Sequence, residues 1–173
     1  MLSRILAVDP TSRGFGYVVV ENGRLIDWGT ACVRPNSNAR VLQRFSELAL
    51  RMQPDLVVVE NYSDAGCRRS SRLQGLMKSI TQRTQSQICR VRLVSISNIQ
   101  GRFASIGART KHQRACWIAT QVPELAPRLP PVRKAWMSED ERMSIFDAAA
   151  LAFPYLSDLR KSIAPINRKR ASA

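Results

Sequence analysis

The chain has 173 residues, 45% hydrophobic and 23% charged, which fits one globular domain with a sizeable core and excludes a disordered polyelectrolyte. Its 27 lysines and arginines outnumber 13 aspartates and glutamates, giving a formal net charge of +14. Such an excess predicts a polyanionic partner, above all nucleic acid, because phosphates that bind basic side chains release their counterions.

Membrane association and structural zinc are both disfavoured by the pattern of residues. The sequence has no run of about 18 apolar residues, and no basic amphipathic helix stands apart from the core pattern. No secretion signal opens it, so we expect a cytoplasmic protein with reduced thiols. The cysteines lie singly, without the paired spacing of a zinc site, at Cys32, Cys67, Cys89 and Cys116.

The N-terminal part predicts three antiparallel strands. Residues 4–8 form an apolar run that ends at Asp9, and residues 15–20 form a second, aromatic and β-branched run. Asn22-Gly23 is a strong hairpin signal, and residues 25–33 supply the third strand beyond it.

A helix and a buried strand follow the meander. Asn38 can cap a helix over residues 39–52, in which apolar residues recur on one face, and Pro54 ends it. Residues 56–59 then form a continuous β-branched run that terminates in Glu60. A strand reached by a helical crossover lies parallel to the first strand.

The remaining elements complete an α/β fold. They are a basic loop, a helix, a strand, an irregular segment, a helix, a proline-rich connection and a final helix, over residues 63–71, 73–80, 92–96, 101–109, 110–120, 122–137 and 139–156. We expect a mixed five-stranded sheet, an antiparallel meander followed by parallel strands, flanked by helices. Residues 1–158 form the predicted domain, and the basic tail, residues 159–173, is expected to be disordered.

Three acidic side chains are candidates for a metal site. Asp9 and Glu60 end two neighbouring parallel strands, so both lie at the sheet edge where ligands bind. Asp147 stands among alanines and apolar residues on the final helix and should face the protein. A carboxylate in such surroundings needs a partner or a cation. A turn or helix-capping role is the alternative for each acid, but jointly they favour a metal site.

These segments carry a resemblance to a known family. The motifs Ile5-Leu-Ala-Val-Asp9-Pro-Thr-Ser-Arg13-Gly-Phe-Gly16-Tyr17, Val57-Val-Val-Glu60 and Phe146-Asp147-Ala-Ala-Ala-Leu-Ala152 resemble the RuvC family of Holliday junction resolvases. The segment Ser105-Ile-Gly107-Ala-Arg-Thr-Lys111 is also similar to that family, and the likeness in order and spacing covers roughly residues 4–156.

The resemblance implies a ribonuclease H-like fold and a homodimer that cleaves four-way junction DNA. It implies two Mg²⁺ ions, with Mn²⁺ as a substitute, held by Asp9, Glu60 and Asp147 at the scissile phosphate. Lys111 matches a family lysine that stabilises DNA phosphate, so these four residues form the expected catalytic set.

The chain departs from the family pattern at one expected acid. The family's fourth acid, one helical turn before Asp147, is here Ser144. Asp140 lies seven residues before Asp147, about 10 Å along a helix, which is too far to share one ion. Ser138 and Glu141 have the spacing of a capping box, so this acidic cluster is expected to start the final helix.

Several basic residues and one aromatic are candidates for DNA contact. Tyr62 follows the second acidic strand and could stack on an unpaired base at a junction centre, and Arg102 could replace the family's basic residue at Gln100. For each arginine, a solvated surface position is the alternative. The DNA-binding set is Arg13, Tyr62, Arg68, Arg69, Arg72, Arg102 and Lys111. Core or interface positions are expected for Trp28, Trp117 and Trp136.

Three functions compete at this stage. The first is a metal-dependent, structure-selective endodeoxyribonuclease that cleaves branched DNA. The second is a branched-DNA-binding protein on the same fold, in which Ser144 reflects lost or weakened catalysis. The third is a phosphotransferase of the actin and sugar-kinase type, but the second glycine-rich phosphate loop that it requires is not found in the sequence.

Overall fold

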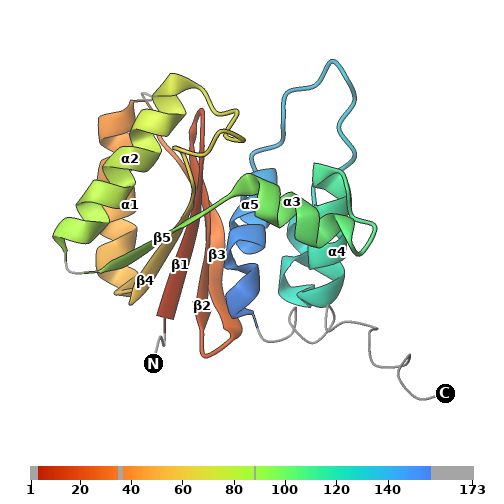
Figure 1. Ribbon diagram of the computed structural model, residues 1–173, viewed down its shortest axis with the longest axis horizontal. Helices are drawn as coiled ribbons and strands as arrows, with labels where there is room; N and C mark the ends of the chain where they lie inside the picture. The colour runs from red at the N-terminus through yellow and green to blue at the C-terminus, as the bar shows by residue number, and fades with distance from the viewer. Residues whose placement is uncertain (1–3, 35–36, 88, 157–173) are drawn as a thin grey trace.

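A single mixed sheet organises the protein (Figure 1). The computed structural model describes residues 4–34, 37–87 and 89–156. Its strands are β1 (Arg4–Thr11), β2 (Gly14–Glu21), β3 (Arg24–Cys32), β4 (Leu56–Glu60) and β5 (Arg90–Val94), in the order β3-β2-β1-β4-β5. The helices are α1 (Asn38–Met52), α2 (Ser71–Ser86), α3 (Ile96–Ala104), α4 (Lys111–Gln121) and α5 (Met143–Ala152), with short 3₁₀ turns at Pro123–Arg128 and Phe153–Tyr155.

The sheet has the predicted antiparallel meander followed by parallel strands. β1 pairs antiparallel with β2, and β2 with β3, through a turn in which Asn22 and Gly23 have φ angles of 50° and 81°. Both angles lie in the left-handed region that Asn-Gly turns require. β4 runs parallel to β1, with Val8 opposite Val59, and β5 runs parallel to β4.

Helices cover both faces of the sheet (Figure 1). α1 and α2 pack on one face, around a core that includes Leu6, Phe45 and Ile80. α3, α4 and α5 lie on the other face, around a core that includes Val58, Phe103 and Ile118. Along the central strands, successive side chains therefore face one apolar layer and then the other, as the alternation of side chains along a strand dictates.

Several expected boundaries were wrong. The final helix begins at Met143 rather than at residue 139, so Ser138 and Glu141 do not form a capping box at its start. Helix α1 is capped by Ser37, whose side chain accepts a hydrogen bond from Arg40 N, and not by Asn38. Part of the irregular segment at residues 101–109 belongs to helix α3.

Two further expectations concern the basic tail and a membrane-spanning helix. The basic tail, residues 159–173, lies outside the described residues. Among the helices described, none is long and apolar enough to cross a membrane.

Candidate active site

Two buried carboxylates lie side by side at one edge of the sheet. Asp9 and Glu60 each follow a paired residue, Val8 and Val59, on the parallel strands β1 and β4. Only 2% of Asp9 and 4% of Glu60 is exposed. The predicted juxtaposition is therefore present, and because burying a charge is unfavourable, the pair requires positive charge nearby.

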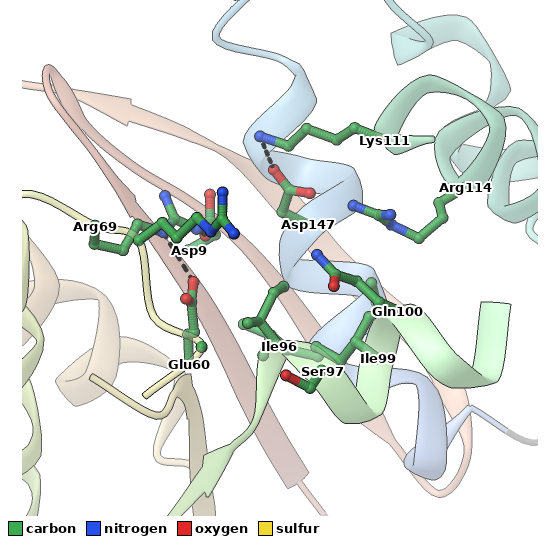
Figure 2. A pocket seen from close by; sticks show the side chains of 14 residues that line it. Asp9, Glu60, Arg69, Ile96, Ser97, Ile99, Gln100, Lys111, Arg114 and Asp147 are labelled. Atoms are coloured by element: carbon green, nitrogen blue, oxygen red, sulfur yellow. Dashed lines mark hydrogen bonds and ion pairs between the residues drawn. The ribbon is translucent and has the colours of Figure 1, made fainter. Parts of the chain in front are cut away.

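The guanidinium of Arg69 supplies that charge from the loop between β4 and α2 (Figure 2). Its Nε donates to Glu60 Oε2 at 2.8 Å, and its Nη2 donates to Asp9 Oδ1 at 2.5 Å. Nη1 also donates to the carbonyl oxygen of Pro10 at 3.2 Å. One side chain thus joins both carboxylates and the end of β1.

Helix α5 brings the third carboxylate to this edge. Gly16, paired with Asp9 across β1 and β2, touches Ser144 of α5 so closely that a Cβ on Gly16 would overlap the Ser144 backbone and hydroxyl. Residues 148–150 of the same helix are buried alanines. Asp147 lies one helical turn beyond Ser144, its side chain 16% exposed, and its charge acts on Asp9.

Lys111 neutralises Asp147. A capping box of Thr110 and Gln113 fixes the start of α4, so that Lys111 is the first helical residue. Its Nζ lies 2.7 Å from Asp147 Oδ2 and 2.8 Å from Glu139 Oε1. Glu139, expected to start the final helix, instead precedes it and shares the lysine with Asp147.

Burial controls the protonation of these groups. Burial raises the pKa of Asp9 from 3.8 to about 7, although Arg69 opposes the increase. Burial likewise raises the pKa of Asp147 against the effect of Lys111. For Lys111 itself, burial lowers the pKa, but the carboxylates around it, Asp147 foremost, outweigh burial and leave the pKa raised. Lys111 therefore stays charged at neutral pH, whereas Asp9 is poised to exchange a proton.

One open pocket of about 590 Å³ contains the whole set (Figure 2). The four residues that were expected to form one site all line it: Asp9, Glu60, Asp147 and Lys111. Arg114 also lines the pocket, is only 9% exposed, and was not predicted. Its position three residues after Lys111, on the same helical face, is the signal that could have identified it.

The predicted DNA-binding residues separate into groups. Arg68 and Arg69 line the pocket with Lys111, while Arg102 lines a different cavity beside α3. Tyr62 packs against the core beneath α1 and α2, and Arg13 is exposed in the turn after β1.

Arg72 connects two helices rather than entering the pocket. Its Nε donates to Asn38 Oδ1 at 3.1 Å, and Asn38 Nδ2 donates back to the Arg72 carbonyl oxygen at 3.1 Å. This contact joins the starts of α1 and α2 and gives Asn38 a role other than helix capping.

The carboxylates of the pocket are the right type of ligand for a hard divalent cation, but they are not arranged as a preformed metal site. Carboxylate oxygens are the ligands that Mg²⁺ prefers, and Asp9 and Glu60 are buried carboxyl groups whose charged forms a cation would compensate. Within the described residues, no three acidic, histidine or cysteine side chains are grouped closely enough to hold a metal ion. Arg69 lies between Asp9 and Glu60, so the two could share an ion only after Arg69 moves away.

Comparison by sequence identifies no relative. No protein-family model matches the chain, and no curated protein matches it significantly.

Solved structures do match, over nearly the whole chain. Thermus thermophilus RuvC is 16% identical with a TM-score of 0.60, covering 92% of this chain and 93% of that one. T. thermophilus RuvC in complex with a Holliday junction substrate is 14% identical, with a TM-score of 0.59 and coverages of 94% and 96%. The yeast mitochondrial Holliday junction resolvase Ydc2 is 12% identical, with a TM-score of 0.63 and coverages of 94% and 80%. The expectation of a ribonuclease H-like fold is confirmed, and the chain has the fold of the RuvC-type Holliday junction resolvases.

Proposed function

We propose that the protein is a metal-dependent, structure-selective endodeoxyribonuclease that hydrolyses phosphodiester bonds of branched DNA. The observation that carries the proposal is the convergence of Asp9, Glu60, Asp147 and Lys111, from four separate elements, on one open pocket. Perturbed titratable groups gathered in a concave site mark a candidate for catalysis. The net charge of +14 supports a polyanionic substrate.

Asp9, Glu60 and Asp147 would hold Mg²⁺, or Mn²⁺ in its place. A bound divalent cation would stabilise negative charge that develops on the phosphate during hydrolysis. Lys111 and Arg114 would orient the DNA strand through its phosphates, because both are basic side chains that line the pocket. The apolar walls from α3, Ile96 and Ile99, would restrict water around the reacting group.

Arg69 would have to leave the carboxylates before they bind an ion together. A divalent cation that binds Asp9 and Glu60 would replace the positive charge of Arg69 and so allow its side chain to move away. The free guanidinium could then bind a DNA phosphate. In this scheme Arg69 protects the buried acids and afterwards contributes to DNA binding.

The substrate class follows the structural neighbours. One of them is a RuvC in complex with a Holliday junction substrate, and we propose branched or four-way junction DNA as the substrate of this chain. A homodimer would present two such sites to the two opposed strands of a junction.

Cleavage of a synthetic four-way junction, beside a linear duplex of matched sequence, tests the proposal. Wild-type protein should nick the junction symmetrically with Mg²⁺ and not with a chelator, while Asp9→Asn should bind the junction without nicking it. Equal cleavage by wild-type protein and Asp9→Asn would remove Asp9 from the site, and cleavage of the duplex at the junction's rate would remove the structural selectivity.

A branched-DNA-binding protein without efficient catalysis is the second candidate. Ser144 stands where the resembled family has an acid, and the Arg69 contacts leave Asp9 and Glu60 compensated without a metal. Tight junction binding by the wild-type protein, with no nicks in either Mg²⁺ or Mn²⁺, would favour this candidate.

A further inference from the structure

An exposed arm, residues 131–139, precedes helix α5 and does not pack in the core. All nine of its residues are exposed. It projects from the same end of the molecule as the loop between β4 and α2, which carries Arg69 (Figure 1). An exposed segment beside a candidate active site is a natural place for substrate contact.

Apolar side chains are concentrated in this arm. Of the six large hydrophobic side chains exposed in the described parts of the chain, the arm has three: Val132, Trp136 and Met137. Trp136 is 80% exposed, so of the core or interface positions expected for it, the core position is wrong. Covering the large apolar face of a tryptophan ring by a ligand lowers the free energy, so such exposure indicates a binding role.

The arm's tip is positively charged. Arg133 and Lys134 precede Trp136, and the Lys134 ammonium lies 5.4 Å from the centre of the Trp136 ring. The acids at the base of the arm are already compensated, since Glu139 pairs with Lys111 and Asp140 with Arg142. A cationic tip with an exposed aromatic ring suits nucleic acid, whose phosphates and bases match these two features.

Both ends of the arm are held in place. Pro130 is buried at its start, and at its end Glu139 pairs with Lys111 of α4, with 2.8 Å between Oε1 and Nζ. The tip itself is closed by a hydrogen bond from Met137 N to the Lys134 carbonyl oxygen, at 3.0 Å. Because its base is fixed, the arm can present Trp136 at a defined side of the pocket.

A second cavity, of about 310 Å³, lies between the arm and the start of α4. Arg133, Met137 and His112 are among the residues that line it, and Lys111 lines both this cavity and the active-site pocket. The two cavities therefore adjoin at Lys111.

We infer that the arm binds an unstacked nucleotide of the DNA, with Trp136 stacking on its base and Arg133 and Lys134 contacting the neighbouring phosphates. The inference rests on the proposed function for its substrate, since unstacked bases occur at the centre of branched DNA. It assigns specificity for branched over linear DNA to residues 131–139, in addition to the carboxylate pocket.

Tryptophan fluorescence on single-stranded oligothymidylate tests the stacking directly, with no chemistry required. Trp28 and Trp117 are partly buried, so quenching by the oligonucleotide should come from Trp136 and disappear in Trp136→Phe. Full-length protein with chelator present should be used, so that cleavage does not interfere.

Affinity for a four-way junction tests the consequence. Trp136→Ala should weaken junction binding by about tenfold, because it removes the aromatic ring on which the base stacks. Its binding to linear duplex should hardly change, and Trp136→Phe should retain most of the junction affinity. Leu50→Ala is the matched control, because Leu50 is 73% exposed on α1, away from the arm.

The outcomes separate this inference from the proposed function. If the junction is cleaved in an Asp9-dependent way but Trp136→Ala binds like the wild type and quenching persists in Trp136→Phe, the arm inference fails alone. If quenching depends on Trp136 while no junction is cleaved, the inference stands and the nuclease proposal fails. Loss of self-association in Trp136→Ala, with DNA binding unchanged, would overturn the inference in favour of a protein interface.

Discussion

The ammonium of Lys111 lies 2.7 Å from Asp147 Oδ2, so the first residue of α4 neutralises the buried acid of α5. Removing this charge should impair cleavage more than folding. We expect Lys111→Met to lower the single-turnover rate on a four-way junction by about a hundredfold, the typical effect of losing one group that stabilises a transition state.

The charge-conserving variant distinguishes catalysis from packing. Lys111→Arg should recover part of the rate, because it keeps a cation beside Asp147, whereas Lys111→Met should remain folded by circular dichroism. Equal rates for the wild type and Lys111→Met would mean that Lys111 only compensates Asp147.

The stability of the protein should depend on pH through Asp9. Burial raises the pKa of this carboxyl to about 7 in the folded protein, from 3.8, so the folded state keeps a proton that the unfolded chain has released. Stability from this group is therefore fully present below pH 3.8 and is lost as the pH rises through 7. The melting temperature should decrease between pH 5 and pH 8, and the decrease should be smaller in Asp9→Asn.

Asp64→Asn is the control for that measurement. Hydrogen bonding by Ser95 lowers the pKa of Asp64, so its protonation changes below 3.8 and outside the measured range. If Asp64→Asn changed the slope between pH 5 and pH 8 as much as Asp9→Asn does, the assignment to Asp9 would be wrong.

Divalent cations should stabilise the folded protein. At a hundredfold excess over its Kd, Mg²⁺ would contribute about 2.7 kcal/mol, or roughly 5–10 °C in melting temperature for a domain of this size. The shift should be larger at pH 8 than at pH 6, because a metal requires the ionised form of Asp9.

The increase in melting temperature with Mg²⁺ should vanish in Asp9→Asn and Glu60→Gln. It should persist in the control Glu47→Gln, because Glu47 pairs with Arg44 on the surface of α1. A chelator should reverse it. An equal shift in all of these variants would place the cation elsewhere on the protein.

Close packing of α5 on the sheet should depend on Gly16. A Cβ there would overlap the backbone and hydroxyl of Ser144, and overpacking of this kind destabilises by about 1–3 kcal/mol. We expect Gly16→Ala to lower the melting temperature and also the cleavage rate, because it pushes Asp147 away from Asp9.

Gly75→Ala is the matched control on α2, where an added Cβ meets nothing within 4 Å. It should stabilise the helix by up to about 1 kcal/mol and leave cleavage unchanged. Thermal denaturation and junction cleavage of both variants would decide the matter, and equal effects at the two positions would argue against close packing at Gly16.

Placing the acid of the resembled family at position 144 should not increase cleavage. Ser144 is 4% exposed, and its hydroxyl donates to the Glu141 carbonyl oxygen beside Gly16. A carboxylate in Ser144→Asp would face that oxygen without a donor, so we expect lower thermal stability and no gain in cleavage. Ser144→Ala should be nearly neutral, and a faster Ser144→Asp would mean that the pocket can accept a fourth acid.

Local patterns predicted the strands and the acids well, but contacts between distant segments less well. The β-branched runs ending in Asp9 and Glu60 predict parallel neighbours because strand geometry decides where the two acids meet. Arg69 and Glu139 could not be placed in this way, since long-range ion pairing, and not periodicity, brings them to the acids and to Lys111.

The start of the final helix was also predicted wrongly, for a related reason. Ser138 and Glu141 have the local spacing of a cap, but pairing of Glu139 with Lys111 and of Asp140 with Arg142 holds these residues outside the helix. Trp136 lies outside the core, which residue type alone could not predict because its neighbours in the arm are exposed as well.

The site's acids come from the first strand, the middle of the chain and the last long helix, so the site cannot exist before synthesis reaches α5. α5 also fills the core between β1 and α4, and a nascent chain that lacks it has neither the third acid nor a complete apolar layer. A chain that terminates upstream of Met143 would therefore lack one of the site's three acids and could not complete the apolar layer on that face of the sheet.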